Sequence, residues 1–160
     1  MGCSDYHFRT QWRFEAEAQE VYQLLSRPEN FFQWLKNFSV RVESLAPGDE
    51  NGIGRKECFT VKGYLPYTLS WQMECVEAHP PFGFTSAASG DLEGRGIWTF
   101  TQRWIWTDVT FDWKVTARKP FLRFTSFILR PVFMWNHDWI MNRWETDLRC
   151  ALAVSRAPSR

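Results

Sequence analysis

The sequence has no excess of charge of either sign. Nineteen Lys and Arg residues stand against eighteen Asp and Glu residues, so the formal net charge is +1. Because nucleic-acid binding needs a strongly basic surface, this balance argues against a nucleic-acid partner. No run approaches the roughly 20 apolar residues that cross a bilayer, and the N-terminus lacks the apolar segment of a secretory signal. We therefore expect a protein of the cytoplasm.

Paired cysteines and clustered metal ligands are also lacking. The four cysteines show no Cys-x-x-Cys spacing. Cys58 and Cys75 fall on opposite parities of two predicted neighbouring strands, so they should face opposite sides of the sheet and stay free thiols, as in a reducing compartment. The three histidines are scattered, and no nucleophile elbow, phosphate-binding loop or dinucleotide fingerprint occurs. We expect no metal and no cofactor, and a nucleophilic enzyme is disfavoured.

Aromatic residues, by contrast, are abundant, at 18% of the chain with ten tryptophans. In strand-like stretches they fall on alternate positions. Three sets carry this alternation: Tyr6, Phe8, Trp12 and Phe14; Trp98, Phe100, Trp104 and Trp106; and Phe111, Trp113 and Val115. Because strand side chains point to the two faces in turn, each of these strands should have one apolar and one polar face.

The predicted elements form one α+β domain over residues 1–160, with its core from about 5 to 154. Patterning and turn signals predict, in order, a strand at 5–14, short helices at 15–26 and 29–36, strands near 40–43 and at 54–62, 68–78, 83–90, 96–106 and 108–118, and a helix at 121–153 interrupted only by Pro131. The last two strands should meet in a tight turn near Thr107 and Asp108. Short turns join antiparallel neighbours only, so we expect seven antiparallel strands.

The widths of these elements predict a cavity. Seven strands at ~4.8 Å spacing make a sheet more than ~30 Å wide, whereas a helix is ~10–12 Å across. A single helix covers such a sheet only if twist and bulges curl the sheet around it. The enclosed volume is hard to fill, so we expect an aromatic cavity of the kind that binds small molecules. The alternative is that ten tryptophans fill the gap completely.

The order of elements and several motifs resemble the SRPBCC superfamily, which includes START, ring-hydroxylase, polyketide cyclase and pollen-allergen proteins. The matching stretches are Ala18–Leu25, Gly90-Asp91-Leu92-Glu93-Gly94, Trp113-Lys114-Val115, and Arg130-Pro131 running into Trp135-Asn136-His137-Asp138-Trp139-Ile140-Met141. In detail the chain is similar to the polyketide cyclase/dehydrase and lipid-transport branch.

This resemblance implies the helix-grip fold, in which a curved seven-stranded antiparallel sheet wraps around one long C-terminal helix and two short helices follow the first strand. It also implies a lipid, polyketide, sterol, quinone or hormone as ligand, and only some members are enzymes. One stretch departs from the family pattern. Members usually carry small or polar residues at the last tight turn, where this chain has Trp104-Ile105-Trp106-Thr107-Asp108.

One histidine is predicted to point into the interior. At 100° per residue, one apolar stripe of the last helix holds Phe133, His137, Ile140, Met141, Trp144, Leu148 and Ala151. His137 could orient a polar ligand group or act as a general acid/base. Alternatively, a neighbouring group satisfies its hydrogen bonds. Gln102 is the polar member of its otherwise aromatic strand face, and we expect it to fix ligand orientation or to bond a buried neighbour.

Glu57 shares the inward parity of Phe59 and Val61. Its carboxylate is within reach of Arg55, two positions earlier on the same strand face. We consider a structural ion pair and a catalytic acid, and the ion pair is the commoner arrangement.

The segment Phe121–Phe133 combines apolar and basic residues. Such an amphipathic segment can rest on an anionic membrane surface, and Pro131 should kink it. The alternative is an ordinary buried start of a helix. Trp135 and Trp139 lie opposite the His137 stripe. They could form a dimer contact or pack against the short helices, so the sequence is compatible with a monomer and with a dimer.

We therefore predict binding, and potentially transport, of a hydrophobic small molecule or lipid in the aromatic cavity. The predicted lining residues are Trp71, Met73, Trp98, Phe100, Gln102, Trp113, His137, Met141 and Trp144. The first alternative is a cyclase or aromatase of the polyketide type that uses His137 as its acid/base. The second is a structural or interaction module with a filled core.

Overall fold

Seven strands form one antiparallel sheet in the order β1-β7-β6-β5-β4-β3-β2. The computed structural model describes residues 5–27, 39–62 and 68–155, and of residues 39, 40 and 120–129 it describes the backbone alone. The elements are β1 (Asp5–Phe14), α1 (Ala18–Leu25), β2 (Ser39–Ala46), β3 (Lys56–Lys62), β4 (Thr68–His79), β5 (Gly83–Gly90), β6 (Leu92–Arg103), β7 (Trp106–Ala117) and α3 (Pro120–Ser155).

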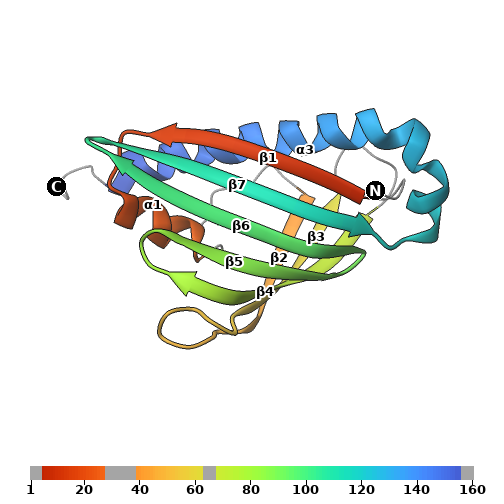
Figure 1. Cartoon of the computed structure of the whole chain (residues 1–160), viewed down its shortest axis with the longest axis horizontal. Coiled ribbons are helices and arrows are strands. Elements are labelled where there is room, and N and C mark those ends of the chain that lie inside the picture. Colours follow the sequence, from red (N-terminus) through yellow and green to blue (C-terminus); the bar gives the residue numbers. More distant parts are fainter. Residues whose placement is uncertain (1–4, 28–38, 63–67, 156–160) are drawn as a thin grey trace.

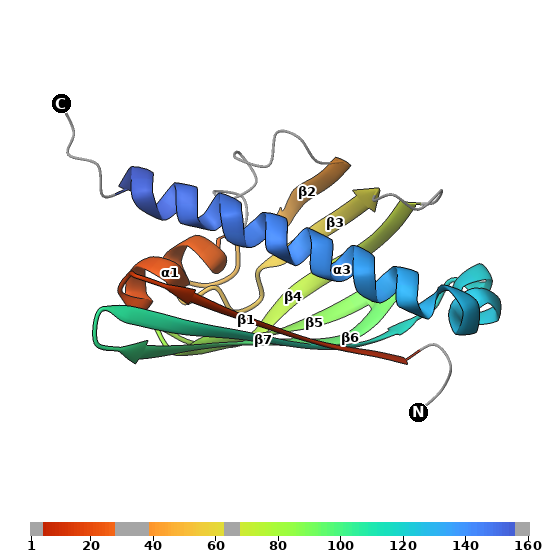
Figure 2. The same cartoon turned by 90° about the horizontal axis from the view of Figure 1, so that it is seen from above.

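The long helix α3 runs across the sheet, and α1 lies at the end where β6 turns into β7 (Figures 1 and 2). The predicted α+β helix-grip architecture is therefore confirmed. The second short helix, predicted at 29–36, lies outside the described residues. α3 contains Pro131, and Figure 2 shows its first turns, in cyan, set at an angle to the rest. No helix within the described residues is long and apolar enough to cross a membrane.

Bulges and one close approach shape the sheet. The pairing register shifts between Ser44 and Ala46 in β2 and between Cys75 and Glu77 in β4. Bulges bend a strand and increase its twist. At Gly94, a Cβ atom would collide with the carbonyl oxygen of Lys114, so only glycine lets β6 approach β7 this closely. These features supply the curl that one covering helix requires.

The inner face of β1 confirms the alternation read from the sequence. Tyr6, Phe8, Trp12 and Phe14 are buried, whereas the residues between them are exposed or half-buried. β1 pairs along its whole length with β7, whose residues 107, 109, 111, 113, 115 and 117 are buried in the same way. The predicted free thiols are also confirmed for Cys58, Cys75 and Cys150.

The turn between β6 and β7 corrects a prediction. The turn lies at Trp104 and Ile105, not near Thr107 and Asp108. Thr107 is fully buried and Asp108 forms ion pairs with Arg13 and Arg103, so the polar groups that suggested a turn are bonded inside a strand. Trp104 is consequently 93% exposed, and it does not continue the aromatic inner face.

Candidate ligand-binding cavity

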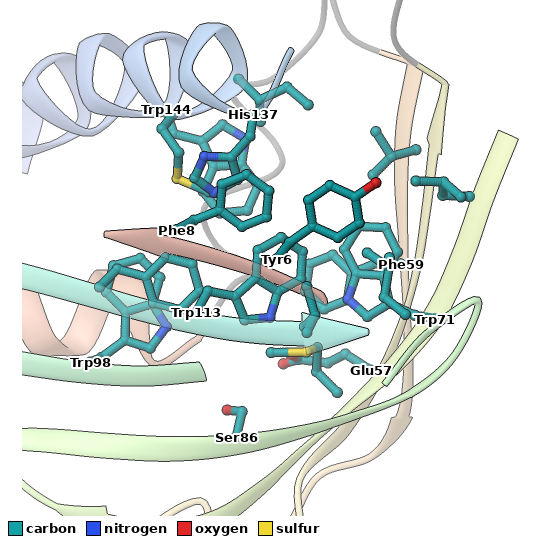
Figure 3. A pocket seen from close by; sticks show the side chains of 18 of the residues that line it. Tyr6, Phe8, Glu57, Phe59, Trp71, Ser86, Trp98, Trp113, His137 and Trp144 are labelled. Carbon is teal, nitrogen blue, oxygen red and sulfur yellow. The ribbon is translucent and has the colours of Figure 1, made fainter. Parts of the chain in front are cut away.

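A cavity of about 150 Å³ lies between the sheet and α3. Aromatic side chains from both layers form most of its wall, and Figure 3 shows them converging from the strands and from the helix. Of the predicted lining residues, the structure brings together Trp71, Met73, Trp98, Trp113, His137, Met141 and Trp144. The interior therefore retains open space, unlike the filled core considered as an alternative.

Phe100 and Gln102 were placed on this wall by the sequence, and the structure corrects both placements. Phe100 is 2% exposed and packs against Tyr22 of α1, with ring centroids 5.5 Å apart. The Gln102 side chain accepts a 2.6 Å hydrogen bond from the backbone N–H of Ala18 and donates one of 2.7 Å to the carbonyl of Trp104. α1 covers this end of β6, so Phe100 becomes core and Gln102 anchors the first turn of α1.

The wall also contains residues that the predicted set lacked. Tyr6 and Phe8 of β1, Glu57 and Phe59 of β3, and Ser86 of β5 all line the cavity. The alternation in β1 and β3 already placed the first four on an inner face and could have identified them. Ser86 gave no such signal because β5 is buried on both faces at residues 83–86.

His137 lies at the centre of the helical side of the cavity (Figure 3). Its ring stacks on Phe8 with centroids 4.0 Å apart. Nδ1 lies 3.5 Å from the carboxylate of Asp138, a long contact to an exposed side chain. Burial lowers the pKa of His137, and the Asp138 hydrogen bond and charge oppose this only in part. The imidazole is therefore uncharged at neutral pH.

Several buried polar atoms of the wall have no hydrogen-bond partner within the described residues. They are the indole nitrogens of Trp71 and Trp113, Nε2 of His137 and Oδ1 of Asn136. Folded proteins pair nearly all such atoms. An apolar cavity with a few unpaired polar atoms is suited to a mainly apolar ligand that carries a polar group.

A buried ion pair forms part of the wall near β3. Arg55 Nε donates to Glu57 Oε1 at 2.9 Å, and the two side chains are only 10% and 6% exposed. The ion pair expected from the sequence is confirmed. The charge of Arg55 also acts on Cys75. Burial raises the pKa of the Cys75 thiol, and the Arg55 charge opposes that shift. The pair gives the cavity a polar but neutral patch.

Across residues 5–27, 39–62 and 68–155, no three His, Cys, Asp or Glu side chains lie close enough together to hold an ion.

No protein-family model and no curated protein matches the sequence. Solved structures do match it along nearly its whole length. Ms6760 from Mycobacterium smegmatis superposes with a TM-score of 0.66 at 12% identity, covering 94% of this chain and 92% of that one. Ara h 8.0201 gives 0.61 at 8% identity, covering 94% and 99%.

The di-domain ARO/CYC BexL from the BE-7585A biosynthetic pathway gives a TM-score of 0.69 at 13% identity. The match covers 99% of this chain and 52% of BexL. The chain has the same helix-grip fold as these solved structures. At these identities the likeness concerns the fold alone, so the function has to be argued from the cavity.

Proposed function

We propose that this protein binds, and carries, a small hydrophobic molecule in the cavity between the sheet and α3. The observation that carries the proposal is the aromatic wall around about 150 Å³ of space. An apolar protein cavity of that size is large enough for benzene. A ring compound therefore suits the space as it stands, whereas a long lipid would require the wall to open further.

Burial of apolar surface would supply the binding energy. A ligand of one or two rings that loses roughly 200 Å² of apolar surface gains about 5 kcal/mol, at ~25 cal/mol per Å². That free energy corresponds to a Kd of about 0.2 mM. Tighter binding would need the polar atoms of the wall to contribute.

Native mass spectrometry of freshly purified protein, followed by organic extraction, tests occupancy directly. Titration with indane, monitored by tryptophan emission, tests binding to the empty form. Ser86→Phe should fill the cavity and abolish the change in emission. Ser89→Phe, on the exposed part of the same strand, is the matched control and should preserve it. A wild-type protein with neither bound mass nor a change in emission would refute the proposal.

A second candidate is a cyclase or aromatase acting on a polyketide-like substrate. His137 favours it, because its side chain lines the cavity and its lowered pKa leaves the ring able to accept a proton at neutral pH. BexL, an ARO/CYC, shares the fold. Turnover that survives His137→Ala would exclude this mechanism.

The cytoplasmic location and the membrane contact also stay proposals. Of the segment Phe121–Phe133, the side chains through residue 129 lie outside those described. Co-sedimentation with anionic vesicles, compared with zwitterionic vesicles, tests the contact. If the protein sediments with neither the anionic nor the zwitterionic vesicles, the membrane contact is excluded.

A further inference from the structure

Two indole N–H groups of the cavity wall lack an acceptor. Nε1 of Trp71 on β4 and Nε1 of Trp113 on β7 are buried, and neither has a hydrogen-bond partner within the described part of the chain. Both side chains line the cavity, and their ring centroids lie 6.0 Å apart. An indole N–H is a donor only, so each group requires an acceptor.

Most of the rings packed around these indoles consist of carbon alone. Trp71 stacks on Phe59 at 5.5 Å, and Trp113 lies 5.7 Å from Phe8 and 6.0 Å from Phe111 between ring centroids. Trp113 also stacks on the imidazole of His137 at 5.8 Å, and its Nε1 donor forms no hydrogen bond with that ring. Carbon rings offer no strong acceptor in the ring plane.

A third tryptophan of the wall provides an internal comparison. Trp98 lines the same cavity and is 7% exposed, against 8% for Trp113. Its indole nitrogen is not among the buried atoms without a partner. Among these three indole nitrogens, those of Trp71 and Trp113 are the ones that are both buried and without a partner within the described residues.

We propose that the cavity selects apolar ring compounds that carry a hydrogen-bond-accepting oxygen, such as an aryl ketone, and that this oxygen accepts from Trp71 and Trp113. A carbonyl oxygen has two lone pairs and can accept from both indoles. A plain hydrocarbon or alkyl chain leaves both donors unpaired. This inference rests on the proposed ligand-binding function and adds to it a chemical class of ligand.

Two probes with one ring skeleton test the selection. Indane and 1-indanone differ in that a carbonyl replaces one CH₂ group. Each is titrated into full-length, ¹⁵N-labelled protein while the indole N–H signals are followed by NMR. Trp71→Phe and Trp113→Phe assign the two signals. We expect 1-indanone to move both indole proton signals downfield, as hydrogen bonding does, and indane not to do so.

Affinities of the variants give a second readout. Trp113→Phe should lower the 1-indanone affinity about tenfold more than it lowers the indane affinity, as expected for one lost hydrogen bond. Trp98→Phe is the matched control, because it also trims a cavity tryptophan. It should change both affinities by the same factor.

The outcomes separate the two proposals. If indane and 1-indanone both bind but shift the two indole signals alike, the selection is refuted and ligand binding stands. The same conclusion follows if Trp71→Phe and Trp113→Phe both leave the ratio of the 1-indanone affinity to the indane affinity unchanged. If neither probe binds the wild-type protein, both proposals fail.

Discussion

The two ends of the interior contain the same kinds of side chain and differ in what covers them. At the filled end, Phe14, Val21, Tyr22, Phe100 and Thr107 are almost completely buried, and α1 packs directly on the sheet. At the hollow end, the rings of the cavity wall face open space beneath α3. Aromatic content alone therefore does not decide whether an interior is solid. The two ends differ in the helix that covers them, α1 at the filled end and α3 at the hollow end.

Polar groups follow the same division. At the filled end, Thr107 donates a 2.7 Å hydrogen bond to the carbonyl of Ala16, and Gln102 bonds the backbone of α1 and of the β6–β7 turn. At the hollow end, the indoles of Trp71 and Trp113 have no partner within the described residues. The paired groups at the filled end hold α1 on the sheet, whereas at the hollow end the Arg55–Glu57 pair is bonded and the two indole N–H groups are not.

The largest difference should appear when a phenylalanine is truncated at each end. Phe100→Ala should lower the free energy of unfolding by about 3–5 kcal/mol, because it creates a new void in a packed region. Phe59→Ala should cost about half as much, since this ring already borders the cavity. Urea denaturation measures both, and equal losses would contradict a filled and a hollow end.

The next largest loss of unfolding free energy is expected at the buried Arg55–Glu57 ion pair. Glu57→Gln leaves the Arg55 guanidinium buried without its opposite charge, and we expect a loss of about 3 kcal/mol. Glu74→Gln removes the partner of Lys56 on the next strand, where both side chains are 44% exposed. That control should cost no more than about 1 kcal/mol. Similar losses in the two variants would show that the Arg55–Glu57 pair is solvated.

A smaller effect is expected at the hydroxyl that fixes α1. Thr107→Val keeps the shape of the side chain and leaves the Ala16 carbonyl without its donor, which should cost about 1–2 kcal/mol. Ligand affinity should not change, because Thr107 lies outside the cavity wall. Thr99→Val, on the exposed face of β6, should stay within about 0.5 kcal/mol. A change in affinity for Thr107→Val would show that the two ends are coupled.

The smallest effect should be the pH dependence due to His137. Burial lowers the pKa of this imidazole below its unfolded value near 6.5, so between the two values the unfolded chain binds more protons. Its contribution to stability is therefore complete above pH 6.5 and is lost as the pH falls toward the lowered pKa. His137→Gln should flatten this part of a stability–pH curve, whereas the exposed His79→Gln should not. An unchanged slope in His137→Gln would place the ring in water.

The sequence allowed much of the fold to be predicted, because β1, β7 and α3 each have one face toward the interior. A period of two in β1 and the His137 stripe in α3 are direct consequences of that geometry. The β6–β7 turn was missed because Trp104 adopts φ = 61°, a conformation usual for glycine or asparagine and unusual for tryptophan.

The alternation within the strands did not show which inner-face residues border the cavity and which lie in the filled core. Phe100 and Trp98 share one parity, yet Trp98 borders the cavity and Phe100 lies under α1. Which residue meets open space depends on where two helices dock on the curved sheet. That docking is a tertiary property that strand periodicity does not contain.

A crystal structure determined under xenon pressure tests directly whether the interior is hollow beneath α3. Xenon enters apolar cavities of this size, so we expect a bound atom in the cavity between the sheet and α3 and none at the filled end near Phe100. An interior with its rings closed together and no xenon between the sheet and α3 would contradict it.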